Sequence, residues 1–307
     1  MSASAPQQVS IPENTHAANL LAIAKDYWTL TKPEVNFLVL ASTFTGFYIA
    51  KQGSTHYGLL LHTLLGTVLV ASGTATLNQF IERHGDAQMR RTAYRPLPSG
   101  RLAPWKALVF GIAISVIGTA ELFFRVNALA SFLAAATLLS YLLLYTPLKR
   151  KTAICTFLGA FPGAMPPLIG WAAVRGNVAP EAWLLFAIVF LWQFPHFLAI
   201  AWLYREDYQR AGLRMLPAAD VTGKFTAYEI VVLTVGLIGI TLLPVLLRLE
   251  GMLYLVAAIV AGILFLKESS RMISHRSKET SRRLLHASVM YLPVLFAMMI
   301  FDRLQWK

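Results

Sequence analysis

The sequence predicts an all-α fold: a polytopic membrane bundle of about nine transmembrane helices. Hydrophobic residues make up 56% of the 307 residues, charged residues make up 14%, and the mean hydropathy is +0.57. This balance lies well outside that of a soluble domain. The apolar residues are gathered in segments close to the roughly 20 residues that a helix needs to cross the hydrocarbon core. Because lipid excludes unpaired backbone, these segments should pack as one helical bundle.

Nine apolar segments follow one another along the chain. They lie at about 34–50, 58–80, 104–122, 127–147, 153–174, 181–203, 227–247, 251–267 and 285–302. Little chain remains between them, so a separate soluble domain is not expected. We therefore divide the chain into a polar cytoplasmic N-terminal tail, 1–30, and a transmembrane domain, 31–307.

Lys and Arg are concentrated in alternate loops, and this pattern predicts the orientation. Most of them lie before the first segment or after the second, fourth, sixth and eighth segments. The opposite side carries only Lys51, Arg125, Arg175, Arg248, Arg303 and Lys307. The positive-inside rule then places the N-terminus in the cytoplasm and the C-terminus in the periplasm. Topology accounts for the net charge of +12, so no nucleic-acid partner is expected.

The start of the chain and its cysteine content narrow the compartment and the chemistry. The first 24 residues contain no Lys or Arg and no apolar core, so neither a secretory signal nor an Arg-rich transit peptide is predicted. This favours a bacterial inner membrane over a mitochondrial one. Cys155 is the only cysteine, which excludes an intrachain disulfide and a multi-cysteine metal site.

A short motif occurs twice in loops on the predicted cytoplasmic side. Residues 91–98 and 210–217 share the pattern Arg-x-x-x-Arg-x-Leu-Pro, and each copy follows an acidic group. Chance is one explanation for so short a match. The other is that the first four and the next four helices are related halves whose loops converge on one site, with the ninth helix as an addition.

The first of these loops follows a row of oxygen-bearing side chains. Asn78, Glu82 and Asp86 are spaced four residues apart, so they should line one stripe of a helix. Hard oxygen ligands suit Mg²⁺, and Arg91 and Arg95 could neutralise a phosphate ester. The alternative is an ordinary charged loop at the membrane surface. Against it, Asn78 lies within an apolar run, where a polar side chain needs a partner.

The sixth segment contains a second set of polar residues at membrane depth. Gln193 and His196 should share a helix face, and Pro195 between them should kink the helix. They are candidates for a substrate or metal site, or for bonds between helices. Asp207, at the cytoplasmic end, could complete a second metal position or form a surface ion pair with a neighbouring arginine.

The fourth segment ends in Tyr145, Lys149 and Arg150 on the same side. The two basic residues are candidates for binding a diphosphate, and the alternative is that they only anchor the topology. Tyr145 lies four residues before Lys149 and should face the same way.

Taken together, these motifs resemble the UbiA-type intramembrane prenyltransferases over about 30–300. The resemblance is carried by Asn78-x-x-x-Glu82-x-x-x-Asp86, Arg91-Thr-x-x-Arg95-Pro-Leu97, Tyr145-x-x-x-Lys149-Arg150 and Trp192-Gln-x-Pro-His196-Phe. The Asn-Gln-x-x-Glu form of the first motif, the Met89-x-Arg-Thr spacing and the Trp-Gln-x-Pro-His-Phe segment are most similar to the heme-farnesylating members. Glu82 replaces the family's usual Asp, and the sixth segment lacks a clear Asp-x-x-x-Asp pair, so a symmetrical two-metal site is not expected.

The resemblance implies an activity and roles for the candidate residues. The farnesyl group of farnesyl diphosphate would pass to the 2-vinyl group of protoheme IX (heme b), giving heme O and diphosphate for heme A and terminal-oxidase biogenesis. Mg²⁺ would be held by Asn78, Glu82, Asp86 and Asp207, and the diphosphate by Arg91, Arg95, Lys149 and Arg150. The catalytic residues would be Asn78, Glu82, Asp86, Arg91, Arg95 and Tyr145. Tyr145 would stabilise the allylic cation with its ring face, and Gln193 and His196 would contact the heme.

The resemblance also makes heme A synthase and oxidase assembly factors candidate partners, besides the lipid bilayer. Two other functions fit parts of the sequence. A UbiA-type enzyme acting on a quinone precursor would share the metal and diphosphate residues, but His196 and the Asn-Gln-x-x-Glu form argue against it. A membrane transporter would share repeated halves and intramembrane polar groups, yet it predicts a polar path across the membrane. The informative groups here cluster on one side.

Overall fold

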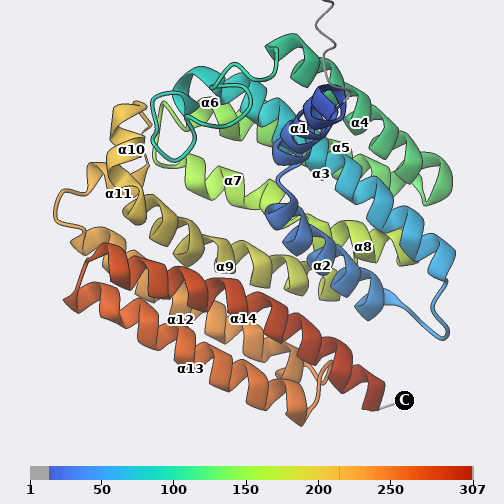
Figure 1. Ribbon diagram of the computed structural model, residues 1–307. Coiled ribbons are helices and arrows are strands. Elements are labelled where there is room, and N and C mark those ends of the chain that lie inside the picture. The colour runs from blue at the N-terminus through green and yellow to red at the C-terminus, as the bar shows by residue number, and fades with distance from the viewer. Residues whose placement is uncertain (1–13, 214, 306–307) are drawn as a thin grey trace, which may run out of the picture.

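The computed structural model describes residues 14–213 and 215–305, and this part of the chain is built of helices and the loops that join them, of which 87–103 is long (Figure 1). The helices are α1 Asn14–Thr31, α2 Pro33–Ala50, α3 Tyr57–Asp86, α4 Pro104–Arg125, α5 Ala128–Ser140, the π-helical η1 Tyr141–Tyr145, α6 Thr146–Leu148, α7 Cys155–Gly163, α8 Pro166–Arg175, α9 Pro180–Leu203, α10 Arg205–Arg210, α11 Leu216–Ala219, α12 Lys224–Leu246, α13 Met252–Ser274 and α14 Lys278–Gln305. The described ranges contain no strand, as the fold-class prediction requires.

Each of the nine predicted membrane segments coincides with a helix or with helices in direct succession. Within the described ranges, eight such units are long and apolar enough to cross a membrane. The ninth predicted segment is α2, which has 18 residues and contains the polar Glu34 and Asn36. One unit, Cys155–Arg175, is divided between α7 and α8 where Pro162 and Pro166 interrupt the helical hydrogen bonds. The protein is therefore a multi-pass membrane protein.

The helices pack in the same order in both halves of the chain. Along the first half, α2 packs on α3, α3 on α4 and α4 on α5; along the second, α8 packs on α9, α9 on α12 and α12 on α13. This matches the predicted pair of four-helix units. The added helix α14 packs against α13, α9 and α2, and so closes the bundle (Figure 1).

The two halves meet where α2 crosses α8, and this contact depends on glycine. A Cβ atom on Gly46 would lie 2.0 Å from the carbonyl oxygen of Pro167, and one on Gly170 would lie 2.0 Å from that of Thr43. Only a residue without a side chain fits at either position. Small residues that let helix backbones approach closely are typical of helix packing in membranes.

The chain before the first predicted segment also forms a helix, α1, which covers 14–30 of the predicted N-terminal tail, 1–30, and ends at Thr31. The rest of that tail, 1–13, lies outside the described residues. Its last turn is fastened to the bundle by Gln79 of α3, whose Nε2 donates to the carbonyl of Leu30 at 2.8 Å. Lys32 then joins α1 to α2 with φ of 51°, in the left-handed region.

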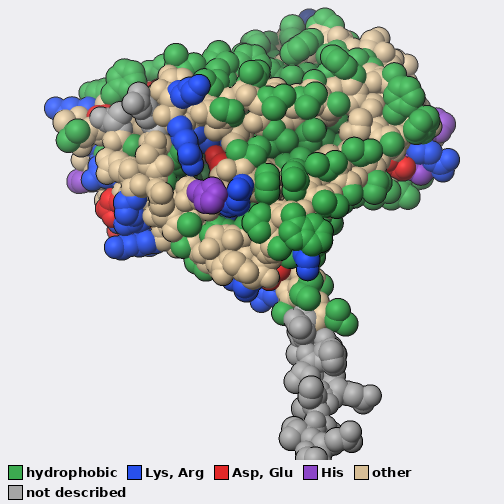
Figure 2. Space-filling view, turned by 90° about the horizontal axis from the view of Figure 1, so that it is seen from above, with side chains coloured by type: hydrophobic (Ala, Val, Ile, Leu, Met, Phe, Trp, Pro, Cys, Tyr) green, Lys and Arg blue, Asp and Glu red, His purple; other side chains and the backbone are tan. Residues whose placement is uncertain are grey.

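Hydrophobic side chains cover the broad middle of the face in Figure 2, whereas Lys and Arg gather toward its ends. Large apolar residues such as Phe124, Val232 and Phe132 are more than half exposed. An apolar middle with charged ends is the surface expected of helices that span a bilayer.

Candidate active site

The polar stripe predicted on α3 faces the short helix α6. Asn78 is buried at 2% exposure, and its Nδ2 donates to the hydroxyl of Thr146 at 3.1 Å. This hydrogen bond leaves the amide oxygen of Asn78 as a possible ligand. The neighbouring turn of α5–α6 is the π-helix η1, and such turns are frequent at functional sites.

Glu82 and Lys149 form the first ion pair of the site. Lys149 Nζ lies 3.0 Å and 3.2 Å from the two carboxylate oxygens of Glu82. The same ammonium lies 4.4 Å from the centre of the Tyr145 ring. Burial alone would lower the pKa of Lys149, but the oxygens of Tyr145 and Tyr141 and the Glu82 carboxylate raise it well above its ordinary value. Lys149 is therefore charged.

A glycine on α7 makes room for the tyrosine in this cluster. A Cβ atom on Gly159 would lie 2.5 Å from the ring of Tyr145. The ring also packs edge to face with Tyr141, with centroids 4.9 Å apart. These contacts hold Tyr145 beside Lys149, as the sequence spacing predicted.

Asp86 and Arg95 form the second ion pair, one helical turn further along the stripe. Arg95 Nη1 lies 2.8 Å from Asp86 Oδ2, and Asp86 is 2% exposed. The hydroxyl of Thr92 donates to the Asp86 carbonyl at 2.8 Å, so the loop after α3 turns back on the helix end. Arg150 also approaches this end, with Nη2 3.0 Å from where a Cβ atom on Gly85 would lie.

The two loops that carry the repeated motif meet at Asp207 of α10. Its Oδ2 accepts a hydrogen bond from the backbone N–H of Arg91 at 3.2 Å, and Arg210 forms an ion pair with its Oδ1. Arg91 and Arg210 are the first residues of the two motif copies, so the loops converge as predicted. The second arginine of the later copy, Arg214, lies outside the described residues.

The guanidinium of Arg91 is held between two tyrosines. It lies 4.7 Å from the ring centre of Tyr204, and its Nη2 is 3.4 Å from the Tyr208 hydroxyl. Its Nε is buried and has no hydrogen-bond partner among the described residues. Arg91 therefore retains donor capacity for a ligand.

The residues predicted to contact heme lie deeper, on α9. Gln193 donates from Nε2 to the carbonyls of Ala160 and Val189 at 3.0 Å and 3.2 Å, which ties α9 to α7. His196 stacks on Trp192, with ring centroids 4.6 Å apart, and its Nδ1 lies 2.8 Å from the Ser288 hydroxyl of α14. Nε2 is then the ring nitrogen left for another partner.

Lys32 lies near the ion pairs of Glu82 with Lys149 and of Asp86 with Arg95, because all four charges act on it. In the sequence it was only one of the basic residues before the first membrane segment. Burial lowers its pKa to about 8, and the positive charges of Arg95 and Lys149 add to that effect.

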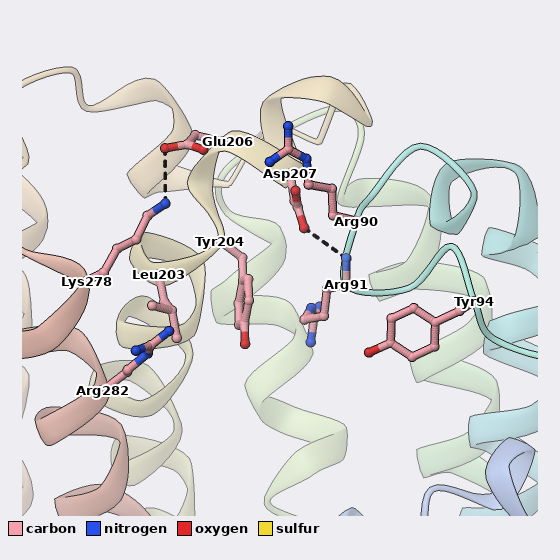
Figure 3. A pocket seen from close by; sticks show the side chains of 9 residues that line it. All are labelled: Arg90, Arg91, Tyr94, Leu203, Tyr204, Glu206, Asp207, Lys278 and Arg282. Atoms are coloured by element: carbon pink, nitrogen blue, oxygen red, sulfur yellow. Dashed lines mark hydrogen bonds and ion pairs between the residues drawn. The ribbon is translucent and has the colours of Figure 1, made fainter.

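A cavity of about 410 Å³ opens beside Arg91 and Asp207 (Figure 3). It is also lined by Arg90, Tyr94 and Tyr204, and by Lys278 and Arg282 from α14. None of these five residues was a candidate in the sequence analysis. For Lys278 and Arg282 the reason is that nothing in the local pattern connects the start of α14 with the loop after α3.

The family model for UbiA prenyltransferases matches residues 39–295. The chain belongs to the UbiA prenyltransferase family. This UbiA prenyltransferase is 49% identical to the protoheme IX farnesyltransferase of Solibacter usitatus, over 91% of this chain and 99% of that one. It is 46% identical to that of Koribacter versatilis, over 98% and 99%. The relative from Salinibacter ruber, with the same name, is 42% identical over 90% and 98%.

Solved structures confirm the UbiA fold at much lower identity. A digeranylgeranylglyceryl phosphate synthase has a TM-score of 0.75 and 20% identity, covering 92% of this chain and 99% of that one. A UbiA homolog from Aeropyrum pernix K1 has a TM-score of 0.71 and 19% identity, covering 88% and 98%. One from Archaeoglobus fulgidus, described as bound to GPP and Mg²⁺, has a TM-score of 0.63 and 13% identity, covering 89% and 99%.

The donor set of this UbiA prenyltransferase fits Mg²⁺ only if a substrate completes it. Among the described residues, no group of three or more His, Cys, Asp or Glu could hold a metal ion. Asn78 and Asp86 are eight residues apart on one helix, a rise of roughly 12 Å, whereas Mg²⁺ binds oxygen at about 2.1 Å. One ion therefore cannot contact both ends of the stripe. Carboxylate and amide oxygens are nevertheless its preferred ligands, and Mg²⁺ commonly adds phosphate oxygens to one or two carboxylates.

Proposed function

We propose that this protein transfers the farnesyl group of farnesyl diphosphate to the 2-vinyl group of protoheme IX, giving heme O and diphosphate. The observation that carries the proposal is the 49% identity, over nearly the whole of both chains, to a protein named protoheme IX farnesyltransferase. The paired acids and bases at one end of the bundle supply the chemistry that such a transfer needs.

In the proposed reaction the bond between C1 of the farnesyl group and the diphosphate oxygen breaks, and its electron pair leaves with the diphosphate. The terminal vinyl carbon forms the new bond to C1. Water adds to the carbon next to the porphyrin ring and releases a proton, which leaves a hydroxyethylfarnesyl side chain. The difficult step is the separation of charge at the start, so groups that stabilise the leaving diphosphate should contribute most.

Four basic side chains would bind that diphosphate: Lys149, Arg95, Arg91 and Arg150. Two of them are now held by the acids of α3, Lys149 by Glu82 and Arg95 by Asp86. Entry of the substrate would exchange these partners, so that the bases contact phosphate and the acids contact its metal ion. Mg²⁺ held by Asn78, Glu82, Asp86 and Asp207, in two subsets because of the length of the stripe, would supply further positive charge to the leaving group.

Aromatic side chains would surround the reacting carbon. Tyr145 already has a cation over its ring, the ammonium of Lys149 at 4.4 Å, which supports its proposed role beside an allylic cation. Phe157, Phe161, Phe190 and Phe194 form a connected set of ring contacts between α7 and α9. They would accommodate the farnesyl chain and exclude water until the acceptor is in place.

The heme would be contacted by His196 and Gln193. His196 Nδ1 is engaged by Ser288, so Nε2 would face the iron. The Gln193 amide nitrogen is occupied by two carbonyls, so its oxygen would be the atom that contacts the substrate. We further propose a bacterial inner-membrane location with the N-terminus cytoplasmic, and heme A synthase or oxidase assembly factors as the proteins that receive the product.

The test is a reaction of the purified protein with heme b, labelled farnesyl diphosphate and Mg²⁺. The expected product is a farnesylated heme, identified by mass spectrometry, that is absent with Asp86→Ala. Prenylation of a phenolic quinone precursor in place of heme, or no diphosphate release with either acceptor, would sink the proposal.

A further inference from the structure

The cavity beside Arg91 has two walls from separate parts of the chain. Arg90, Arg91 and Tyr94 come from the loop after α3, Lys278 and Arg282 come from α14, and Tyr204 stands between them (Figure 3). The lining does not include Glu82, Lys149, Asp86 or Arg95. The cavity is therefore adjacent to the proposed diphosphate cluster, with Arg91 and Asp207 at the boundary.

Two arginines of this cavity carry charge that the described protein does not neutralise. The two acids that line the cavity are already engaged. Glu206 lies 3.4 Å from Lys278, and Asp207 binds Arg210 and the Arg91 backbone. Neither Arg90, on one wall, nor Arg282, on the other, has an ion-pair partner among the described residues. Arg91, which lines the same cavity, has a buried Nε without a hydrogen-bond partner among the described residues. An anion is the ligand that this arrangement fits.

Lys149 and Arg95 of the diphosphate cluster are paired with acids that a metal diphosphate would engage, whereas Arg90 and Arg282 have no such partner among the described residues. A transferase with two substrates needs a second binding site, for the acceptor. His196 lies further along the same two helices: Leu203 of the cavity lining is seven residues after His196 on α9, a rise of roughly 10 Å, and Ser288, the partner of His196, is six residues after Arg282 on α14, roughly 9 Å.

We infer that this cavity binds the carboxylates of the acceptor, with Arg90 and Arg282 each taking one of the two propionates of the porphyrin. The inference rests on the proposed function, which makes heme b the acceptor. Tyr94 and Tyr204 flank the edge of the macrocycle, and its apolar body extends along α9 toward His196. The charged end of the acceptor stays at the membrane surface while its vinyl group reaches the buried site.

The experiment measures binding as well as turnover, with the full-length protein in nanodiscs of neutral phosphatidylcholine. Heme b and its propionate dimethyl ester are titrated separately by the change in heme absorbance, and the KM for farnesyl diphosphate is measured in parallel. The variants are Arg90→Gln and Arg282→Gln. Arg283→Gln is the matched control, because Arg283 is the next residue of α14, is exposed, and is paired with Glu279 at 2.5 Å.

We expect each cavity variant to weaken heme b binding about tenfold, the effect of one lost hydrogen bond to a charged group. Binding of the dimethyl ester should be the same in wild type and variants, and the KM for farnesyl diphosphate should stay within about twofold. Arg283→Gln should resemble wild type throughout. Repeating the titration with anionic phosphatidylglycerol tests whether a lipid phosphate is the true ligand, because it would then compete with heme b in wild type only.

Two results would overturn the inference: equal affinity of wild type and both variants for heme b, or a raised KM for farnesyl diphosphate without weaker heme binding. Strong competition by the anionic lipid, with no preference for heme b over its ester, would reassign the cavity to lipid. Formation of farnesylated heme by the wild type alongside any of these results would leave the proposed function standing. Absence of that product would remove both.

Discussion

Lys149 Nζ lies 3.0 Å from Glu82 Oε1, although the two residues are 67 positions apart in the chain. The pair joins the polar stripe of α3 to the end of the fourth predicted membrane segment, and the Tyr145 ring centre lies 4.4 Å from the ammonium. Acid, base and aromatic ring are thus in one cluster before any substrate arrives. The proposed reaction requires all three kinds of group at the same carbon–oxygen bond.

Replacement of the acid in this pair should slow the reaction strongly. We expect Glu82→Gln to lower kcat by a factor on the order of 100 to 1,000, the usual cost of losing one electrostatic contribution to a transition state. The measurement is the rate of farnesylated heme formation at saturating substrates. Glu279→Gln is the control, because Glu279 also pairs with a cation, Arg283, but on the exposed surface of α14. Equal rates for the two variants would show that the Glu82 carboxylate has no part in the chemistry.

Removal of the metal should abolish the reaction reversibly. We expect a chelator to stop product formation and added Mg²⁺ to restore it, because the donor oxygens of this site suit that ion. Asp86→Asn should raise the Mg²⁺ concentration needed for half-maximal rate about tenfold or more. Asp26→Asn should not change it, because Asp26 is bound to Arg101 outside the proposed site. Full activity in the chelated enzyme would contradict the proposed role of these oxygens.

The Lys32 side chain should make stability depend on pH in the alkaline range. Its pKa is about 8 in the folded protein and 10.5 ordinarily, chiefly because of burial, so the unfolded chain holds the proton more tightly. Unfolding then takes up a proton between these two values, and stability should rise with pH across that window. The measurement is the thermal unfolding midpoint of the ligand-free protein. In Lys32→Met the rise should be smaller, and an unchanged slope would mean that Lys32 is not the group that titrates.

Substitution of His196 should alter the spectrum of bound heme. If Nε2 binds the iron, His196→Gln changes the Soret band and weakens binding, whereas Ser288→Ala, which removes only the Nδ1 partner, produces a smaller shift. His286→Gln is the control on α14, because His286 is exposed. Identical spectra for wild type and His196→Gln would show that His196 does not bind the iron, which leaves it only its contacts to Trp192 and Ser288 within the protein.

The sequence predicted the local features well, because they depend on neighbouring residues. Hydropathy marked all nine helical segments, and spacing predicted that Asn78, Glu82 and Asp86 share one helix. The repeated motif predicted that the two loops meet, and Asp207 is where they do. The resemblance to UbiA prenyltransferases, drawn from four short motifs, is confirmed by the family match over 39–295.

The sequence alone thus determined the fold class, the family and the identities of the polar residues, since hydropathy and helical periodicity are properties of short segments. Only the tertiary structure decided their partners: Glu82 with Lys149, Asp86 with Arg95, and Gln79 with the end of α1. It also brought Lys32 near Arg95 and Lys149, and placed Arg282 of α14 in the lining of the same cavity as Arg90. Such pairings depend on how helices far apart in the chain pack, and no local pattern encodes that distance.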